Sequence, residues 1–227
     1  MREKPDHLGH RQRLRGKFLK GGAAALHDYE LLELLLFHSV PRQDTKPLAK
    51  ALLARFGALS AVFDATTDEL RSVKDLTEPS ITLIRLVKEL GIERTAEQMR
   101  AADAMSSPQA VIGYARAALT GLGYEAFLAI FLNAKNMVLG HQLIHEGTID
   151  HAVVYPRRII EAALAKRAAG LILVHNHPSG ETAPSEDDKK LTKSIAEAAK
   201  HMDIRVLDHI IVGARGYFSF AEKHLLT

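Results

Sequence analysis

Apolar residues recur at helical spacing from about residue 23 to residue 100. The clearest stretch holds leucines at positions 31, 32, 34, 35 and 36. It follows Asp28, a good N-cap, and stops before Pro41, because the residue before a proline is pushed out of the helical region. Further helices with similar spacing and end signals are predicted at Pro47–Phe56 with Gly57 as its stop, in a short segment capped by Thr67, and at Ile81–Gly91. Residues 1–100 are therefore predicted to form a small all-α domain.

The pattern changes after AADAMSSPQ, residues 101–109, which are small, polar and proline-bearing. Composition of this kind marks a domain boundary, so the second domain is placed at residues 101–227. Ser107 and Pro108 fit the start of a helix that ends near Gly121. Later segments rich in apolar and β-branched residues predict strands, in EAFLAIFLN, MVLGHQLIH, HAVVYP, LILVHNH and IRVLDHIIVG. With helices at Arg157–Ala168 and from Ser185, the second domain is predicted to be α/β, a mixed sheet flanked by helices.

Composition narrows the classes of protein and of metal site. The 227 residues are 47% apolar and 25% charged, which is typical of a globular protein. Cysteine is absent, so disulfides and thiolate zinc sites are excluded and any zinc must bind to imidazole and carboxylate. The N-terminus is charged where a secretory signal is apolar, and no apolar run approaches the ~18 residues of a membrane span. We therefore expect a cytoplasmic protein with no membrane contact.

A group of metal-compatible side chains lies in LILVHNHPSGETAPSEDD, residues 171–188. Side chains alternate along a strand, so His175 and His177 emerge on the same side of its C-terminal end. The loop that follows is rich in turn formers, and Ser185 is a good N-cap that sets Asp188 in the first turn of a helix. Asp188 can therefore return to the point that both imidazoles face.

Two histidines and one aspartate form a ligand set that suits one zinc ion and leaves a fourth position for water, as catalytic sites do. Such a centre, with a carboxylate as general base, hydrolyses amides, and Ser185 can donate to the oxyanion, cap the helix, or do both. Taken singly, each feature has a structural explanation: the histidines as residues of a strand, Ser-x-x-Asp as a helix cap, and the acidic residues 186–188 as a first turn that complements the helix dipole. Their conjunction after one buried strand favours the metal site.

These residues resemble the JAMM signature of the JAB/MPN metallopeptidases, in which His-x-His-Pro is followed after a loop by Ser-x-x-Asp. More narrowly, HNHPSG with PSEDD, EGTIDHAVVYPRRIIEAAL and VLDHIIVG resemble the RadC family from about residue 107 to the C-terminus. The resemblance implies a zinc-dependent peptidase or isopeptidase with a JAB/MPN-like, cytidine-deaminase-like C-terminal domain. It also implies a peptide or protein substrate, while the oligomeric state stays open.

JAB/MPN enzymes place a glutamate at the start of the strand that follows the first helix of the domain. Glu125, which opens EAFLAIFLN, fits that position and is predicted to be the general base. Glu146 in HEGT is the competitor because it also precedes a turn.

Three other histidines and one aspartate have weaker signals. Asp208 and His209 are adjacent on a predicted strand, so they cannot both face the metal; one is either a partner that holds a ligand imidazole or a hydrogen-bonded core residue. His141 and His145 are four residues apart, which pairs side chains on a helix but not obviously on a strand.

The alternative function is a DNA-associated protein, linked by the family's name to repair, whose C-terminal domain is a scaffold. The N-terminal domain loosely resembles helix-hairpin-helix modules, but residues 73–79 hold no glycine where such a hairpin has a Gly-x-Gly turn. Weak, salt-sensitive DNA binding would then depend on the basic residues of the N-terminus, which are His10, Arg11, Arg13, Arg15, Lys17 and Lys20. A third hypothesis is a metal-dependent hydrolase of a non-peptide bond.

Overall fold

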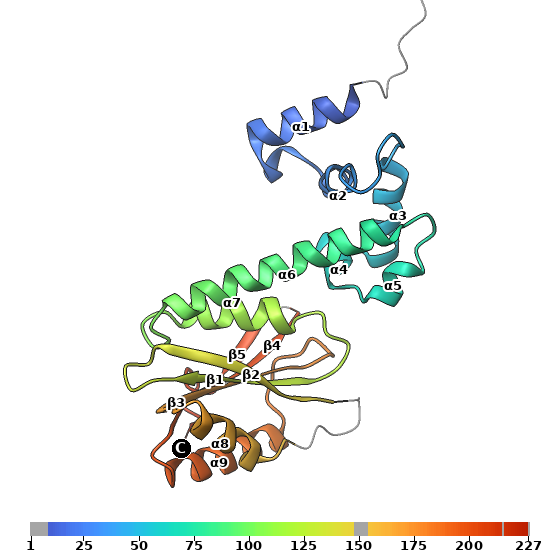
Figure 1. Cartoon of the computed structure of the whole chain (residues 1–227). Coiled ribbons are helices and arrows are strands. Elements are labelled where there is room, and N and C mark those ends of the chain that lie inside the picture. Colours follow the sequence, from blue (N-terminus) through green and yellow to red (C-terminus); the bar gives the residue numbers. More distant parts are fainter. Residues whose placement is uncertain (1–8, 148–153, 215, 227) are drawn as a thin grey trace, which may run out of the picture. The chain divides into compact units, whose positions relative to one another are not determined.

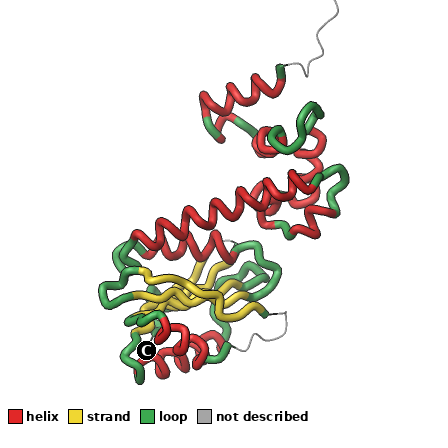
Figure 2. The backbone as a smooth tube through the Cα atoms, viewed as in Figure 1, coloured by secondary structure: helices red, strands yellow, loops and turns green. Residues whose placement is uncertain are grey.

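The computed structural model describes residues 9–147, 154–214 and 216–226. The chain divides into two compact units between Leu90 and Gly91, and each unit is described by itself (Figures 1 and 2). In the described part of the chain, no helix combines the length and the apolar character that crossing a bilayer requires.

The first unit is all-helical, as the sequence predicts. Its elements are α1 (His10–Gly21), the 3₁₀ turn η1 (Ala23–Ala25), α2 (Asp28–Leu36), α3 (Lys46–Phe56), α4 (Leu59–Asp64), α5 (Thr67–Arg71) and the first turns of α6 (Glu78–Ala101). The leucine-rich helix buries Leu32 and Leu36 against Leu52 of α3 and Leu70 of α5. Burial of these apolar faces, rather than helix propensity, holds such short helices together.

The helix ends differ from the prediction where a neighbouring residue caps better. His27, not Asp28, is the N-cap of α2 and forms a capping box with Glu30. Thr66, not Thr67, caps α5 by accepting a hydrogen bond from the amide of Glu69 at 3.2 Å. In both cases the acidic residue three positions on binds the N-cap amide, which satisfies a donor that the helix itself leaves unpaired.

Helix α6 is longer than the predicted Ile81–Gly91 and runs through Gly91. A glycine inside a helix costs only about 1 kcal/mol, and beyond it Ala96 and Met99 are buried in the core of the second unit. The division between units therefore lies inside α6, before the predicted boundary at residues 101–109. The observed division and the predicted boundary differ because apolar side chains on the last turns of α6 are buried in the second unit. Composition does not reveal such burial.

The basic residues of α1 make contacts within the helical unit. His10 Nε2 lies 2.7 Å from Glu33 Oε1, and Lys17 pairs with Glu30 at 3.2 Å. Arg11 donates to main-chain carbonyls between residues 37 and 43. These contacts hold α1 against α2 and the segment after it, so a structural role explains part of the basic run. DNA binding through this helix stays a prediction.

The second unit contains a five-stranded mixed sheet, which confirms the predicted α/β class. The strand order is β2-β1-β3-β4-β5; β3 and β4 are parallel and the other pairs are antiparallel. The strands are β1 (Ala126–Leu132), β2 (Val138–Glu146), β3 (Gly170–Asn176), β4 (Arg205–Gly213) and β5 (Gly216–Ser219). Helix α7 (Pro108–Leu119) covers one face, and α8 (Pro156–Ala165) and α9 (Glu186–Lys200) cover the other (Figure 1).

Two predictions about strands differ from the structure. The expected strand HAVVYP falls partly on residues 151–153, outside the described residues, while Val154 and Tyr155 lie in no strand and Pro156 opens α8. Strand β5 was not predicted because it is short and gains its partners only from the end of β4. The last turn of α8 also ends earlier than predicted, at Ala165.

Candidate metal centre

Strand β3 lies in the middle of the sheet and is buried along its whole length. Leu171 and Leu173 face α8 and α9, and alternation sets His175 on that same face. His175 is fully buried and stacks on Phe127, its partner on β1. His177 follows the strand end and keeps 18% of its side chain exposed. Solvent therefore reaches the group at His177, while His175 is closed off from it.

Asp188 completes the group from the first turn of α9. Ser185 caps this helix: its hydroxyl accepts from the Asp188 amide at 3.1 Å and donates to Asp188 Oδ2 at 2.6 Å. The amide of Ser185 donates to the same carboxylate oxygen at 2.7 Å. The predicted capping role of Ser185 is thus confirmed, and its effect is to fix the Asp188 carboxylate. A role for Ser185 toward an oxyanion stays a prediction.

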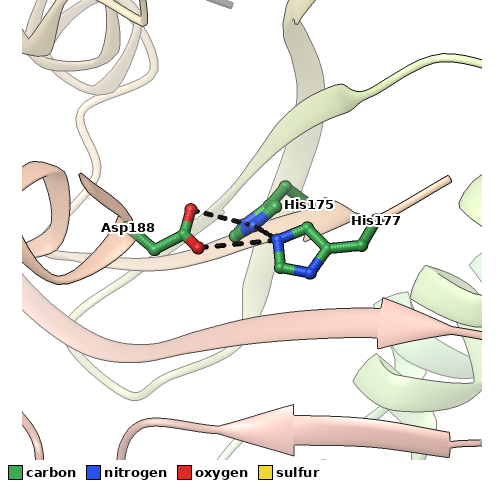
Figure 3. Close-up of side chains that lie close together, drawn as sticks. All are labelled: His175, His177 and Asp188. Carbon is green, nitrogen blue, oxygen red and sulfur yellow. Dashed lines mark hydrogen bonds and ion pairs between the residues drawn. The ribbon is translucent and has the colours of Figure 1, made fainter. Parts of the chain in front are cut away.

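The three predicted ligands converge (Figure 3). His175 Nε2 lies 2.9 Å from His177 Nε2 and 3.1 Å from Asp188 Oδ1, and His177 Nε2 lies 3.5 Å from Asp188 Oδ2. Ligands bound to one zinc ion at roughly 2.0–2.1 Å in a tetrahedral arrangement are roughly 3.3 Å apart. The spacing and the chemistry of these donors therefore fit a zinc-sized cation, and the group can bind a metal.

The loop between β3 and α9 orients His177. His177 Nδ1 lies 3.0 Å from the carbonyl of Glu181, which only accepts, so Nδ1 carries the proton and Nε2 faces the other ligands. The loop lies close to the end of β4, where a Cβ added at Gly213 would collide with the carbonyl of Gly180. Gly180 itself has a φ of +82°, a conformation that glycine adopts readily. Two glycines thus permit the loop path that holds His177.

Electrostatics favours an anionic Asp188. Burial by itself raises the pKa of this carboxyl, but hydrogen bonds from His175, His177 and Ser185 lower the pKa well below its ordinary range. The hydrogen bond and charge of Asp188 in turn raise the pKa of His177, against the opposing effect of burial. The three side chains thus form a site for which a proton and a metal ion compete.

Glu125 lies on the same side of the sheet as His175. It directly precedes β1 and lies two residues before Phe127, so the alternation of side chains sets both on one face, and Phe127 stacks on His175. The charge of Glu125 also contributes to the raised pKa of His177. Glu146 pairs with Ala126 and lines a groove beside Tyr114 of α7, on the opposite face. The register therefore favours Glu125 over Glu146 as the carboxylate near the candidate centre.

Asn176, which the sequence analysis did not single out, clamps the chain on both sides of Glu125. Its Oδ1 accepts from the Ala126 amide at 2.8 Å and its Nδ2 donates to the Tyr124 carbonyl at 2.9 Å. Adjacent strand residues face opposite ways, so Asn176 points away from the two histidines and contacts the first residue of β1 and the segment before it. Its place between the two histidines is the sequence signal that could have singled out Asn176. Its partners could not be predicted, because they lie about fifty residues earlier in the chain.

Asn176→Ala is expected to weaken the placement of Glu125 without touching the metal ligands. Loss of both hydrogen bonds leaves the Ala126 amide and the Tyr124 carbonyl without these partners, which costs about 1–3 kcal/mol of unfolding free energy. Urea denaturation and zinc titration should show lower stability with zinc affinity kept. Asn133→Ala is the matched control, because Asn133 also accepts two amide hydrogen bonds, at the other end of β1. A large loss of zinc affinity in Asn176→Ala alone would contradict this assignment.

The sequence left open which of His209 and Asp208 contacts a candidate ligand imidazole and which is a hydrogen-bonded core residue. His209 Nε2 lies 2.8 Å from His175 Nδ1, so His209 is the partner of a candidate ligand imidazole. Asp208 instead accepts hydrogen bonds from the Ser219 hydroxyl at 2.6 Å and the Ala221 amide at 2.9 Å, which ties β4 to the segment after β5. Asp208 is therefore a structural residue of the sheet.

His141 and His145 lie on opposite faces of β2. His141 pairs with Ile130 and contacts Tyr114, whereas His145 pairs with Phe127, because a bulge shifts the register between them. Among the described residues, neither joins the group of candidate ligands.

Comparison with known protein families matches both parts of the chain. The family described as RadC-like JAB domain matches residues 105–225 and thus the whole sheet with its candidate metal centre. The family described as UPF0758 N-terminal matches residues 6–81, within the helical unit.

Proposed function

The chain belongs to the RadC family, and from this premise we propose that it is a zinc-dependent hydrolase of peptide or isopeptide bonds. The observation that carries the proposal is the convergence of His175, His177 and Asp188 at the end of a buried strand. Two neutral imidazoles and one carboxylate are a set that zinc prefers, and three protein ligands leave a position for water, as catalytic zinc sites do.

A zinc ion bound there would polarise a substrate carbonyl and lower the pKa of a coordinated water toward ~7. The residues of the chain supply the rest of the chemistry. Glu125 takes the proton of the attacking water and delivers it to the leaving amine, as a general base that then acts as a general acid. Ser185 fixes the carboxylate of Asp188 through the hydrogen bond between its hydroxyl and Oδ2.

The test has two stages. Elemental analysis of protein purified without chelator should find about one zinc per chain, and a screen of peptides, ε-amino-linked isopeptides and non-peptide esters should find cleavage that chelator abolishes and zinc restores. Folded protein that neither retains nor takes up zinc would overturn the proposal. Cleavage confined to the esters would favour a hydrolase of a non-peptide bond, because the same centre can attack other electrophiles.

Zinc binding is expected to weaken on acidification. The pKa of His177 is raised, chiefly by its hydrogen bond to Asp188, so without metal it keeps a proton to a higher pH than an ordinary histidine. Zinc must displace that proton. Zinc affinity should therefore be constant above the pKa of His177 and fall by up to about tenfold per pH unit below it. Competition with a chromophoric chelator across pH measures this; an affinity that rises on acidification would contradict it.

A further inference from the structure

The helical unit contains a cavity of about 450 Å³ between the start of α1, helix α2 and the loop that leads to α3. Its lining includes Glu33 on α2, Phe37 directly after that helix, and Arg42, Asp44 and Thr45 on the loop. The volume lies within the usual range of small-molecule sites, roughly 300–1,000 Å³. The candidate metal centre lies in the other unit of the chain. The cavity is therefore distinct from that centre.

A buried carboxylate in the wall of this cavity is only partly paired. Glu33 is 1% exposed, and its Oε1 lies 2.7 Å from His10 Nε2. Its Oε2 is shielded from solvent and accepts no hydrogen bond from the described residues. Buried polar atoms in folded proteins nearly always have a partner, so an unpaired one requires a specific explanation. A group that donates N–H bonds, such as an ammonium group, would pair with this carboxylate.

An arginine of the opposite charge lines the same cavity. Arg42 has a φ of +68°, in the left-handed region where glycine is the favoured residue. Its side chain has no hydrogen bond or ion pair within the part of the chain that the structure describes. Arg11 differs, because its guanidinium donates to the main-chain carbonyls of residues 37, 40 and 43 and is thus used within the fold. The guanidinium of Arg42 is therefore available to an anionic group of a ligand.

We propose that this cavity binds a small zwitterion of the α-amino acid class, with its ammonium group on Glu33 and its carboxylate on Arg42. The ligand reaches Glu33 past His10, whose side chain is 34% exposed. A simple anion would meet the carboxylates of Glu33 and Asp44, and a simple cation would meet the guanidinium of Arg42. Among the described residues of the helical unit, no group of three metal-compatible side chains is present, which argues against a metal ion. The proposed site does not depend on the hydrolase function.

Binding of amino acids to the full-length, metal-free protein tests the proposal. Metal must be removed with chelator first, because the amino and carboxylate groups of an amino acid also bind zinc. Glycine, leucine and lysine are the probes, and methylamine and acetate are the matched compounds that each keep one charge. The backbone amide NMR signals of residues 33–45 should shift saturably with the amino acids. At the same concentrations, methylamine and acetate should shift these signals at least about tenfold less, since each lacks one charged contact.

Two variants test the two charged contacts. Glu33→Gln and Arg42→Gly should each weaken binding at least about tenfold, as loss of a hydrogen bond between charged groups does. Arg42→Gly also separates binding from folding, because glycine adopts this backbone conformation readily and should keep or raise the melting temperature. The controls are Glu30→Gln, on the same helix, and Arg167→Gly, which makes the same change at a φ of +53° in the other unit. Both controls should bind the amino acids as the parent does.

Three outcomes would overturn the proposal. The first is the absence of saturable shifts with every amino acid in folded parent protein, which would leave the cavity to water. The second is equal affinity for glycine and methylamine, which would indicate a site for a simple cation. The third is parental affinity in either Glu33→Gln or Arg42→Gly. None of these results bears on zinc content or on cleavage, so the proposed hydrolase function stands or fails by its own test.

Discussion

Asp188→Ala is expected to reduce zinc content from about one ion per chain to a trace. The substitution removes the only anionic ligand of the group, and the remaining imidazoles, His175 and His177, compete with protons for the metal. It also removes the N3 half of the capping box of α9, whose carboxylate accepts hydrogen bonds from the amide and hydroxyl of Ser185; loss of a hydrogen bond to a charged group costs about 1.5–3 kcal/mol of unfolding free energy. The loss of zinc must therefore be separated from the loss of the cap.

Glu69→Ala provides the control for the cap. Glu69 is the N3 residue of the same kind of capping box in α5, in the other unit of the chain. Both variants should melt at a lower temperature than the parent, but only Asp188→Ala should lose zinc by elemental analysis. Added zinc should raise the melting temperature of the parent and of Glu69→Ala, because a ligand that binds only the folded state stabilises it. Full zinc content in folded Asp188→Ala would exclude Asp188 as a ligand.

Glu125→Gln is expected to lower kcat by about 10²–10⁴-fold, which is the usual contribution of a general base, while zinc content stays that of the parent. The amide keeps the size of the carboxylate but cannot take a proton from water. The rate should be measured on whichever substrate of the screen the parent cleaves. Since Glu125 is no ligand in the proposed arrangement, a zinc titration of the same variant shows whether the centre is intact.

Glu146→Gln is the matched control, because it makes the same change at the end of β2 on the other face of the sheet. It should cleave at the parental rate. If Glu146→Gln is inactive and Glu125→Gln is active, the assignment of the base is reversed. If both variants are active, the proton is taken by another group and the role proposed for Glu125 fails.

Local pattern was enough for several of the helices and for the three candidate ligands. The spacing of leucines before Pro41 reflects burial of one helix face, and the structure buries Leu32 and Leu36 as that spacing requires. His175, His177 and Asp188 are close in sequence, and strand alternation, a turn-forming loop and a Ser185 cap bring them together. Such features depend on residues a few positions apart, which is the range that sequence pattern reports.

The surroundings of the ligands were decided only by the tertiary structure. His209 reaches His175 because β4 pairs with β3 in one register, and Thr192 reaches His209 because α9 packs on the same face. Nothing in a single sequence states which strands pair or in which register. The same holds for Glu125 against Glu146, which a bulged pairing of β1 and β2 separates onto two faces.

The sequence by itself therefore determined an all-α region, a mixed α/β region and a group of three candidate metal ligands, because periodicity, capping and strand alternation act over a few residues. The tertiary structure alone decided where α6 passes from one unit to the other, which carboxylate shares a face with His175, and which side chains contact the candidate ligands. The physical reason is that strand register and face-to-face packing join residues far apart in the chain, and a shift of one residue moves a side chain to the other face of the sheet.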